Sequence, residues 1–515
     1  MGGLLQLVTV GVQDKYIHGN PQITFFKSVY RRHTNFAIES IEQRINGKSY
    51  TGDGNIGNVI LSKGNGDLVN KIFVQVDQVD TGINGDEIIE EVELIIGGTL
   101  IDKHTKEWIQ IWRELTIPSS KSEGIKYMCN SFENNIATRA DNTNQSCVII
   151  PLMFWFCRYP GVSLPILSLQ YDDILLKFKW GDNVNINKNS STYLYHDCSV
   201  WVDYIYLDRD ERVRFAQYEH EYLIEQLQYQ DTSSQGEQTM FTMKFNHPVK
   251  ELIWTENNTG NNAITNQKLN ITLNEIDRLA YQFKEYFTLK QPFDHHTSIP
   301  GYNIKEYDRS KLLMKPILIM AGKNRARSSV GSGAALSPSI SDFEITNDAN
   351  NIAHLKLSIL ANHTVPIIKI GDLLSITYPI VSGEEGITIY GTVSEIKTPA
   401  VAGGIVGEYV LNIESGIGDI STPWGETSID GNGSVSIIAR AQDPSSRCSN
   451  LKKNIYVYSF SLNPEEHQPS GTMNFSRINK SKIRITEAKK IDTIYAVNYN
   501  ILRIAGGTTS LMYSN

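Results

Sequence analysis

The sequence predicts an all-β protein with two β-sandwich domains in series, joined by a short helical connector. Three observations support this fold class. Short alternations of apolar and polar residues, separated by Asn, Gly, Asp and Pro, recur along both halves of the chain, as is typical of proteins with many strands. Their length and spacing suit a sandwich or jelly roll. Between them, residues 207–228 (LDRDERVRFAQYEHEYLIEQLQ) are rich in charge and begin with a helix-capping pattern.

The composition indicates a folded protein without affinity for nucleic acid. A chain of 515 residues is long enough for roughly three domains of about 150 residues each. Its 40% hydrophobic and 10% aromatic content is that of an ordinary globular protein. Lys and Arg total 48 against 56 for Asp and Glu, and the net charge of −8 does not supply the positive field that phosphate-backbone binding needs. We therefore expect no direct nucleic-acid partner.

The cysteines and the N-terminal sequence indicate synthesis and folding in the cytosol. The cysteines are Cys129, Cys147, Cys157, Cys198 and Cys448. They are odd in number, widely spaced and without a C-x-x-C pair, so neither a disulfide framework nor a zinc site is predicted. The opening MGGLLQLVTV lacks the basic region of a signal peptide, and Gln6 stands where a myristoylation motif has Ser or Thr. No run reaches the roughly 18 apolar residues of a membrane span.

Residues 1–35 are interpreted as an N-terminal arm. Asn20-Pro21 interrupts any helix, and four apolar residues follow at helix-like spacing among four basic ones. These residues are Phe25, Phe26, Val29 and Tyr30, with Lys27, Arg31, Arg32 and His33. The segment is either a basic amphipathic arm under the first domain or a short helix whose aromatic side chains are core and whose cations are solvated. Both interpretations place Phe25 and Phe26 against protein.

Residues 36–206 are predicted to form the first sandwich. In VNKIFVQVDQV, the residues Ile72, Val74 and Val76 alternate with more polar neighbours, as in a strand with one buried face. The stretch CVIIPLMFWF at 147–156 has the same apolar character and is also expected to be a strand. One helix is predicted in KEWIQIWRELTIP, where apolar residues fall on one face before Pro118 ends it. These residues are Trp108, Ile111, Trp112 and Leu115.

Residues 207–228 are predicted to be the helical connector, and the second sandwich follows it. Asp208 can cap the helix, with Glu211 completing a capping box. The second sandwich is expected in residues 229–310 and 451–515, where TIYAVNYNILRIAGG is a long strand by pattern. Residues 311–450 contain further strands and are interpreted as an inserted β-rich module, because loops on a rigid sandwich tolerate long insertions.

Two motifs resemble ligand-binding sites but are better explained as turns. GDGNIG (Gly52, Gly54, Gly57) matches G-x-G-x-x-G, yet it leads into a strand, so the helix N-terminus that would bind a pyrophosphate is missing and a hairpin turn is favoured. Asp294-His295-His296 contains possible metal ligands. Adjacent histidines on a strand face opposite sides, and no carboxylate follows at a matching spacing, so a turn with satisfied polar groups is favoured.

Two further segments contain candidate general acids or bases. They are Glu465, Glu466 and His467 in NPEEHQPSG, and Glu219, His220 and Glu221 in the connector. Neither comes with a nucleophile motif, a zinc-binding helix motif or a P-loop. The sequence therefore predicts no catalytic, cofactor-binding or metal-binding residues, no cofactor and no enzyme activity, although tertiary structure could still bring together two carboxylates of a glycosidase.

Six segments, in order, resemble the major capsid proteins of nucleocytoplasmic large DNA viruses. They are GNPQITFFKSVYRRHTNF, LDRDERVRFAQYEHEYLIEQLQ, FNHPVKELIW, QPFDHHTSIP, VYSFSLNPEEHQPSGTMNFSRI and YAVNYNILRIAGG. The resemblance implies two consecutive eight-stranded jelly-roll β-sandwiches with short helices. It also implies a structural protein whose homotrimer forms a pseudo-hexagonal capsomer of an icosahedral virion shell, assembled in the host cytoplasm. With the resemblance in place, the connector is interpreted as a packed, salt-bridged link that sets the angle between the jelly rolls.

The chain departs from this family pattern at residues 311–450. In the family, the segment resembling QPFDHHTSIP is followed closely by the one resembling NIYVYSFSLNPEEHQPSG, whereas here the module intervenes. Loops at that end of family capsomers tend to face outward, so the module is expected to project from the virion and to be available to a glycan or receptor. Residues 1–35 are the candidate contact with minor capsid proteins or an internal membrane.

Two other functions are compatible with the same fold class. A carbohydrate-binding or carbohydrate-active β-sandwich would have a cleft with paired carboxylates of perturbed pKa. A receptor-binding spike would be present in low copy number on the particle. Light scattering and negative-stain images distinguish a six-sided trimeric capsomer from a compact monomer.

Overall fold

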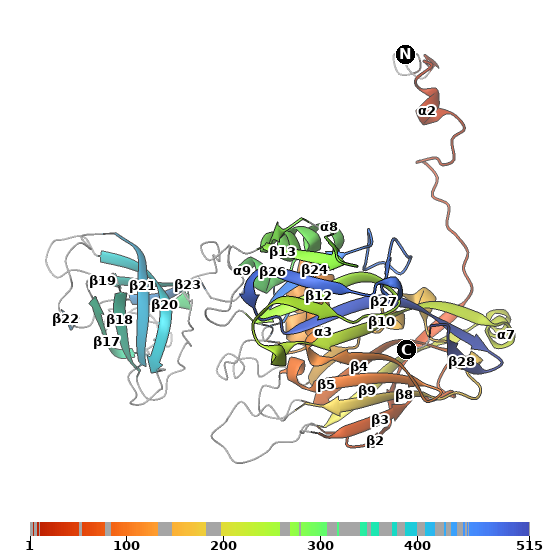
Figure 1. Ribbon diagram of the computed structural model, residues 1–515, viewed down its shortest axis with the longest axis horizontal. Helices are drawn as coiled ribbons and strands as arrows, with labels where there is room; N and C mark the ends of the chain where they lie inside the picture. The colour runs from red at the N-terminus through yellow and green to blue at the C-terminus, as the bar shows by residue number, and fades with distance from the viewer. Residues whose placement is uncertain are drawn as a thin grey trace, which may run out of the picture.

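The computed structural model describes most of the chain. The described residues are 4, 8–9, 11–50, 54–77, 84–131, 147–181, 197–257, 268–277, 280–305, 317–318, 340–347, 352–359, 373–378, 387–398, 407–417, 427–428, 434–439, 446–448, 451 and 453–513. Figure 1 shows two stacked β-sandwiches, a separate β-sheet beside them and an N-terminal arm that extends away.

The first half of the chain forms two antiparallel sheets that face each other. One sheet has the order β1 (Phe36–Gln43), β9 (Cys198–Leu207), β4 (Leu68–Asp77), β7 (Cys147–Pro151). The other has the order β2 (Ile45–Gly47), β3 (Ile56–Ile60), β8 (Ile174–Trp180), β5 (Ile89–Ile96), β6 (Thr99–Thr105). In β4, Ile72, Val74 and Val76 are buried while their neighbours are partly exposed, as the alternation predicts. The buried side chains of the two sheets form one core.

The second half repeats this arrangement. Its first sheet has the path β10 (His220–Asp231), β27 (Thr493–Ala505), β12 (Pro248–Asn257), β24 (Lys453–Ser459), with β25 (Met473–Asn474) on β12 and β28 (Thr508–Leu511) on β27. The facing sheet has the path β11 (Gln238–Met243), β26 (Ser481–Lys489), β13 (Lys268–Leu273), β14 (Ile276–Asp277), with β15 (Gln282–Phe283) on β13. In both halves the first sheet contains the first and last long strands side by side, which is jelly-roll connectivity. The all-β, double jelly-roll prediction is confirmed, although the sheets hold four and five strands in one half and six and five in the other.

The helices of the described residues are short, and all except α2 in the N-terminal arm lie in the connections between strands. They are α2 (Lys15–His18), η1 (Gly85–Glu87), α3 (Lys106–Thr116), α4 (Ser119–Met128), α6 (Trp155–Arg158), η2 (Pro160–Val162), η3 (Ile166–Ser168), α7 (Arg209–Gln217), η4 (Ser233–Gln235), η6 (Tyr286–Lys290), α8 (Gln291–His295), α9 (Gly301–Lys305) and η7 (Phe475–Arg477). The predicted helix in KEWIQIWRELTIP is α3, and Thr105 caps it by accepting a hydrogen bond from Trp108 N. The strand expected through residue 156 ends at Pro151, because Trp155–Arg158 turns into the helix α6.

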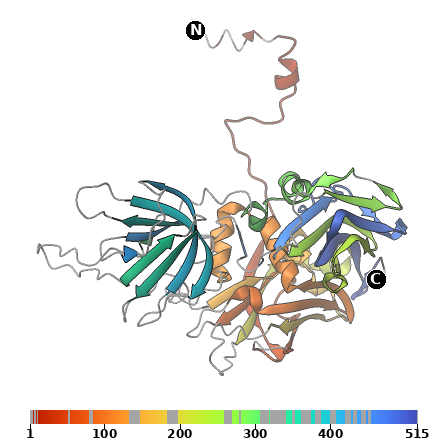
Figure 2. The same ribbon diagram turned by 60° about the vertical axis from the view of Figure 1, so that its left-hand side comes forward.

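Between Ile317 and Ala439, the described strands form a sheet of their own. Its order is β16 (Ile317–Leu318), β23 (Ser434–Ala439), β19 (Leu373–Tyr378), β20 (Ile387–Thr398), β21 (Gly407–Ile417), β18 (Ile352–Ile359), β17 (Ile340–Asn347), β22 (Thr427–Ser428). Leu374, Val393 and Leu411 are buried within it. Figures 1 and 2 show this sheet to one side of the paired jelly rolls.

The prediction of a helical connector over residues 207–228 is wrong in its second half. The helix α7 ends at Gln217, and β10 begins at His220. β10 pairs with β27 along its whole length, so strand pairing outweighs the local helical tendency of EYLIEQLQ. None of the nine residues of α7 is buried, so the prediction that this part of the connector is packed is also wrong. Two contacts attach α7 to the first jelly roll. Arg212 forms a 3.0 Å ion pair with Asp67, and Ser168 Oγ donates a 2.7 Å hydrogen bond to the Phe215 carbonyl.

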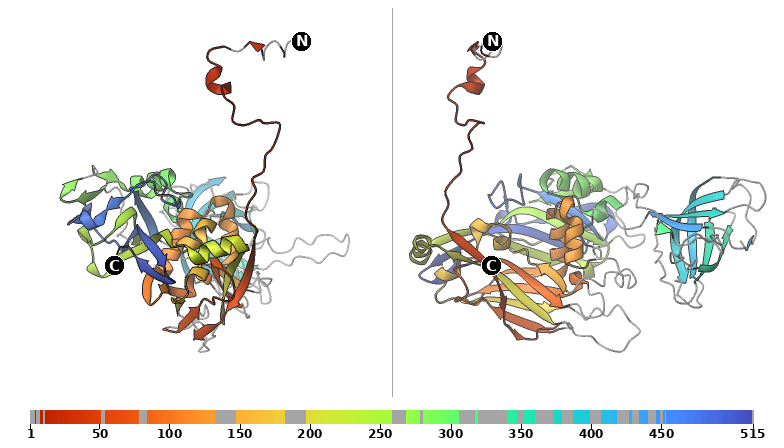
Figure 3. Two further views of the ribbon diagram at one scale, coloured as in Figure 1. Left: turned by 90° about the vertical axis from the view of Figure 1, so that its right-hand side faces the viewer. Right: turned by 180° about the vertical axis from the view of Figure 1, so that it is seen from behind.

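The arm does not pack against the chain from which it emerges. Phe25 and Phe26 are 89% and 99% exposed, so the prediction that they contact protein is wrong for the single chain. The four-residue helix α2 also buries no side chain. In both panels of Figure 3 the arm extends away from the jelly rolls. Since large exposed aromatic residues are costly in water, any cover for them must come from another molecule.

The described part of GDGNIG fits the predicted strand connection, because Gly54 and Asn55 directly precede β3, where Gly57 lies. β2 pairs antiparallel with β3, with Gly47 opposite Gly57, and no helix follows. Gly57 has a steric reason to be glycine, because an added Cβ would lie 2.7 Å from the Lys48 carbonyl and 2.9 Å from Trp180 Nε1. Gly52 lies outside the described residues.

The arm and the inserted strands leave the jelly rolls at opposite ends. β1 starts beside the end of β9, where α7 begins, because Phe36 pairs with Leu207. β10 also starts at the α7 end. β24, the first strand after the insertion, starts beside the end of β12, with Lys453 opposite Asn257. Since β12 and β10 are both antiparallel to β27, they run in the same direction, and β24 therefore starts at the end far from α7 (Figure 1).

Candidate functional site

The contact between the two jelly rolls is the most elaborate site in the described part of the chain. Helix α3 of the first jelly roll lies across the β27–β12–β24 sheet of the second. The apolar members of this layer are Trp108, Ile111, Trp112, Leu115, Ile253, Cys448, Leu451, Ile455, Val457, Tyr495 and Val497. The Trp108 ring centre lies 5.2 Å from that of Tyr495 and 5.4 Å from that of Trp112. The amphipathic pattern of α3 therefore buries its apolar face between domains.

Six charged or titratable side chains lie beside this apolar layer. We refer to them as the inter-domain charge cluster: Arg158, Glu225, Lys250, Glu251, His296 and Glu465. They come from α6, β10, β12, the turn after α8 and the loop after β24. Three carboxyl side chains thus face Arg158, Lys250 and one imidazole, so the formal charges of the cluster balance only when His296 is protonated.

Glu225 is the centre of one half of the cluster. Its carboxylate lies 2.6 Å from Arg158 Nη1 and 2.7 Å from Lys250 Nζ. Burial would raise the pKa of Glu225, but the two cations outweigh burial and lower it. Lys250 is fully buried and also donates a 2.5 Å hydrogen bond to the Pro464 carbonyl. Arg158, from the first jelly roll, also stacks over Trp112 at 4.4 Å, so this ion pair crosses the domain boundary.

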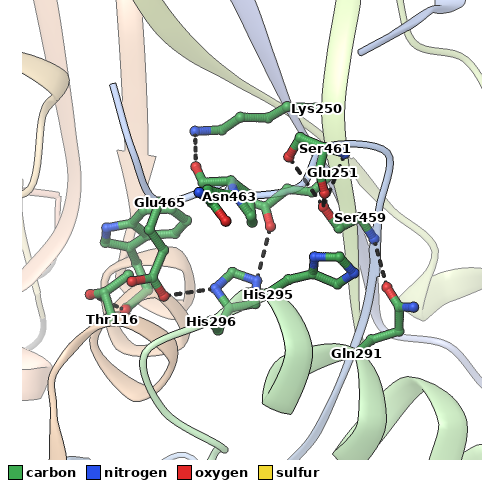
Figure 4. Close-up of polar contacts among 12 residues, drawn as sticks. Thr116, Lys250, Glu251, Gln291, His295, His296, Ser459, Ser461, Asn463 and Glu465 are labelled. Carbon is green, nitrogen blue, oxygen red and sulfur yellow. Dashed lines mark hydrogen bonds and ion pairs between the residues drawn. The ribbon is translucent and has the colours of Figure 1, made fainter. Parts of the chain in front are cut away.

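His296 is the centre of the other half (Figure 4). Its Nδ1 lies 2.9 Å from Glu465 Oε1 and its Nε2 lies 3.0 Å from Glu251 Oε2. Burial would lower the pKa of His296, but the two carboxylates outweigh burial and raise it to about 9. The pKa of Glu465 is lowered: burial opposes the change, but His296 and the hydrogen bonds from Thr297 outweigh it. The side chains thus hold a buried imidazolium between two carboxylates.

The structure brings together two segments that the sequence singled out separately. His296 of Asp294-His295-His296 contacts Glu465 of NPEEHQPSG, and His295 Nδ1 lies 2.9 Å from the Leu462 carbonyl of the same loop. Both Nδ1 atoms of the turn have polar partners, as expected, whereas His296 Nε2 is in ion-pair contact with Glu251 without hydrogen-bond geometry. Asp294 pairs instead with Lys290, and Glu466 is exposed. Burial lowers the pKa of His467, whose ring centre lies 5.9 Å from that of Tyr159.

Glu219, His220 and Glu221, the candidate acids and bases in the connector, are not part of this site. Glu219 and Glu221 lie 2.7 and 3.9 Å from the guanidinium of Arg503 in largely exposed ion pairs. His220 Nε2 lies 2.9 Å from the Phe215 carbonyl, where it joins the end of α7 to the start of β10. These residues therefore stabilise a local turn and do not converge on a ligand.

Sequence reasoning did not identify Arg158, Glu225, Lys250 or Glu251 as site residues. A signal was present in VKELIW, where Lys250 and Glu251 interrupt an otherwise apolar strand. Buried charges are rare unless paired, so adjacent opposite charges in such a strand indicate buried partners from elsewhere. In this cluster each acid has a cation beside it and the apolar layer adjoins it, which fits a structural contact better than acid–base catalysis.

Tandem jelly rolls joined by a buried charged contact define a protein of the double jelly-roll class. Among solved structures, the chain resembles the PBCV-1 capsid protein VP54 fitted into a reconstruction of the virophage Sputnik, with a TM-score of 0.58, 25% identity and coverage of 96% of this chain and 100% of that one. A quasi-atomic model of the PBCV-1 virus capsid gives a TM-score of 0.56 with the same identity and coverage.

Sequence comparisons identify the family. Residues 24–208 match the model of the major capsid protein N-terminus, and residues 211–311 and 450–510 match that of the large eukaryotic DNA virus major capsid protein. The major capsid proteins of Pyramimonas orientalis virus and Paramecium bursaria Chlorella virus 1 are 33% and 31% identical to this chain, each with full coverage of both sequences. The chain belongs to the family of large eukaryotic DNA virus major capsid proteins, and its place is the virion capsid.

Proposed function

We propose that the chain forms a homotrimer whose six jelly rolls make a pseudo-hexagonal capsomer, and that these capsomers tile an icosahedral shell. The observation that carries this proposal is the repeated strand order of the two jelly rolls, joined by a buried contact. Three copies of such a pair place six similar units around one axis. A hexagonal outline requires a constant angle between the two units, and a neutral, buried charge cluster beside an apolar layer provides a specific geometry for that angle.

The ends of the strands support an orientation of the capsomer in the shell. The arm leaves at the α7 end and the inserted module at the opposite end, so one faces inward when the other faces outward. We assign the arm to the inner face, where its exposed aromatic and basic side chains would contact minor capsid proteins or an internal membrane. Residues 311–450 then form the outer projection, available to a glycan or receptor.

The proposal includes a non-catalytic role and assembly in the host cytoplasm. All five cysteines are free thiols, which fits a reducing compartment. Burial raises the pKa of Cys157 to about 12, which keeps its thiol protonated and unreactive. The part of the chain that the structure describes has no helix long and apolar enough to cross a membrane.

Light scattering combined with negative-stain imaging of the purified full chain tests the trimer. We expect particles of about three times 58.0 kDa with six-sided outlines. A compact monomer that binds or cleaves glycans would instead support the carbohydrate-binding alternative. Quantitative mass spectrometry of virions separates shell from spike, because a spike would be present in far fewer copies than a shell protein.

A further inference from the structure

The two ends of the insertion meet at the C-terminal end of α3. The chain enters the insertion after residues 298–303 and leaves it at residues 446–448, and we call these two segments the stems. By sequence the first stem belongs to the second jelly roll and the second stem is the end of the inserted module, whereas α3 belongs to the first jelly roll. Ser298 N donates a 3.0 Å hydrogen bond to the Leu115 carbonyl, and Ser298 Oγ donates a 2.7 Å one to the Ile117 carbonyl. The first stem is thus attached to the end of α3.

Glu114 of α3 binds both stems at once. Its Oε1 accepts hydrogen bonds from Arg447 N and Cys448 N, both at 2.6 Å, and from Ser446 Oγ at 3.0 Å. Its Oε2 accepts one from Gly301 N at 3.1 Å. The side chain is buried, at 2% exposure. A carboxylate is suited to this position because both of its oxygens accept hydrogen bonds, and donors that lose water on burial need such partners.

Arg447 of the second stem adds further hydrogen bonds to this junction. Its guanidinium donates to the carbonyls of Ile117 at 3.0 Å and Ile299 at 3.3 Å, and to Ser298 Oγ at 2.8 Å. Arg447 is also 2% exposed. One residue of the second stem therefore contacts the first stem and α3 together. The two stems and α3 form a single hydrogen-bonded junction, although Glu114 and Arg447 are 333 positions apart.

We infer that Glu114 is the positioning residue of the inserted module: it fixes both stems to the first jelly roll, so the orientation of the module depends on the docking of the two jelly rolls. A 140-residue insertion held only by its own jelly roll would pivot about its two ends. Attachment to α3 adds a third point outside that jelly roll and restricts the pivot. The inference does not depend on which face of the shell the module occupies.

Glu107 provides a matched control in the same helix. It lies seven residues, or about two turns, before Glu114 and so projects from nearly the same side. It too crosses the domain boundary, with Oε1 3.0 Å from Lys453 Nζ and 2.9 Å from Thr255 Oγ1. Neither partner belongs to a stem. Removal of Glu107 therefore weakens the same inter-domain contact without releasing the module.

The test compares Glu114→Ala, Glu114→Gln and Glu107→Ala in the full chain by hydrogen exchange. We expect Glu114→Ala to raise the exchange rates of the Gly301, Arg447 and Cys448 amides about tenfold or more, as expected for the loss of a charge-assisted hydrogen bond. Glu114→Gln, which keeps one acceptor oxygen, should produce a smaller increase and replaces Glu114→Ala if that variant does not fold. Glu107→Ala should leave the three amides protected.

Pulsed electron paramagnetic resonance measures the orientation of the module directly. Spin labels are placed at Lys397→Cys in β20 and Glu123→Cys in α4, both exposed, with the partly buried Cys147 replaced by Ser. We expect the distance distribution to broaden in the Glu114 variants and to stay narrow in Glu107→Ala. The inference is overturned if the Glu114 variants keep both the exchange protection and the narrow distribution. It is equally overturned if Glu107→Ala broadens the distribution as much as they do.

Discussion

Replacement of His296 by Gln should remove a specific pH dependence from the stability of this capsid protein. His296 is fully buried between Glu251 and Glu465, and its pKa is raised from 6.5 to about 9. A group whose pKa is higher in the folded than in the unfolded chain binds its proton more tightly when folded. Its contribution to stability is therefore fully present below pH 6.5 and is lost as the pH rises through about 9.

The size of this contribution follows from the pKa difference. Each pKa unit corresponds to about 1.4 kcal/mol, so the free energy of unfolding should fall by on the order of 3 kcal/mol between pH 6.5 and pH 9.5 because of His296. Gln can keep one hydrogen bond but carries no charge, so in the variant the Glu251 and Glu465 carboxylates have no shared cation at any pH, whereas in the wild type they have one below about pH 9. Relative to the wild type, the variant should be destabilised most at pH 6.5 and least at pH 9.5.

Urea unfolding followed by tryptophan fluorescence at pH 6.5, 8 and 9.5 measures this difference. Protein concentration is held constant, because the stability of an oligomer depends on it. His295→Gln is the matched control, since His295 is the adjacent histidine and lies 2.9 Å from a single carbonyl. A stability gap between wild type and His296→Gln that stays constant from pH 6.5 to 9.5 would refute the assignment of a buried imidazolium. A similar pH-dependent gap in His295→Gln would also contradict it.

Three further predictions concern the inter-domain contact and the arm. Glu225→Ala should cost about 3–5 kcal/mol in urea unfolding because it removes the carboxylate between the buried Lys250 and the partly buried Arg158. Adding Lys250→Met should restore part of the loss, and additive losses in this double-mutant cycle would argue against the pairing. Trp112→Ala removes a side chain that is 1% exposed, so the free energy of unfolding should fall by about 3–5 kcal/mol and the trimer fraction in light scattering should decrease. An intact trimer of normal stability would contradict the role of α3. Deletion of residues 1–35 should leave trimers intact and prevent shell growth, so shells of normal size from the truncated chain would exclude the proposed role of the arm.

The helix α3 could be predicted from sequence because its signal is local. Trp108, Ile111, Trp112 and Leu115 recur at helical spacing, and all four are buried on one face. The alternation of buried and exposed residues in β4 was predicted from sequence in the same way. The partner of α3 was not predictable, because an apolar stripe specifies that a face is buried and does not specify which sheet buries it.

In the connector, the start of the helix could be predicted from neighbouring residues, but its end could not. Asp208 accepts a hydrogen bond from Arg209 N as a helix cap, as predicted. The end of the helix at Gln217 is set by β27, which is nearly three hundred residues further along the chain and pairs with β10 from His220 onward. Phe25 and Phe26 in the arm illustrate the converse, because the spacing predicted burial that the single chain does not supply.

The order of the amino acids was sufficient for features that depend on near neighbours, such as the alternation in β4 and the helical spacing in α3. Family resemblance then indicated the tandem jelly rolls. The pairing of the buried charges required the folded chain, because Arg158 and Glu225 are 67 positions apart and His296 and Glu465 are 169 positions apart. Coulombic attraction depends on distance in space and on exclusion of water, and neither is encoded in any short segment. The same holds for Glu114, an ordinary helical glutamate in the sequence that becomes a shared acceptor for two stems only after the jelly rolls dock.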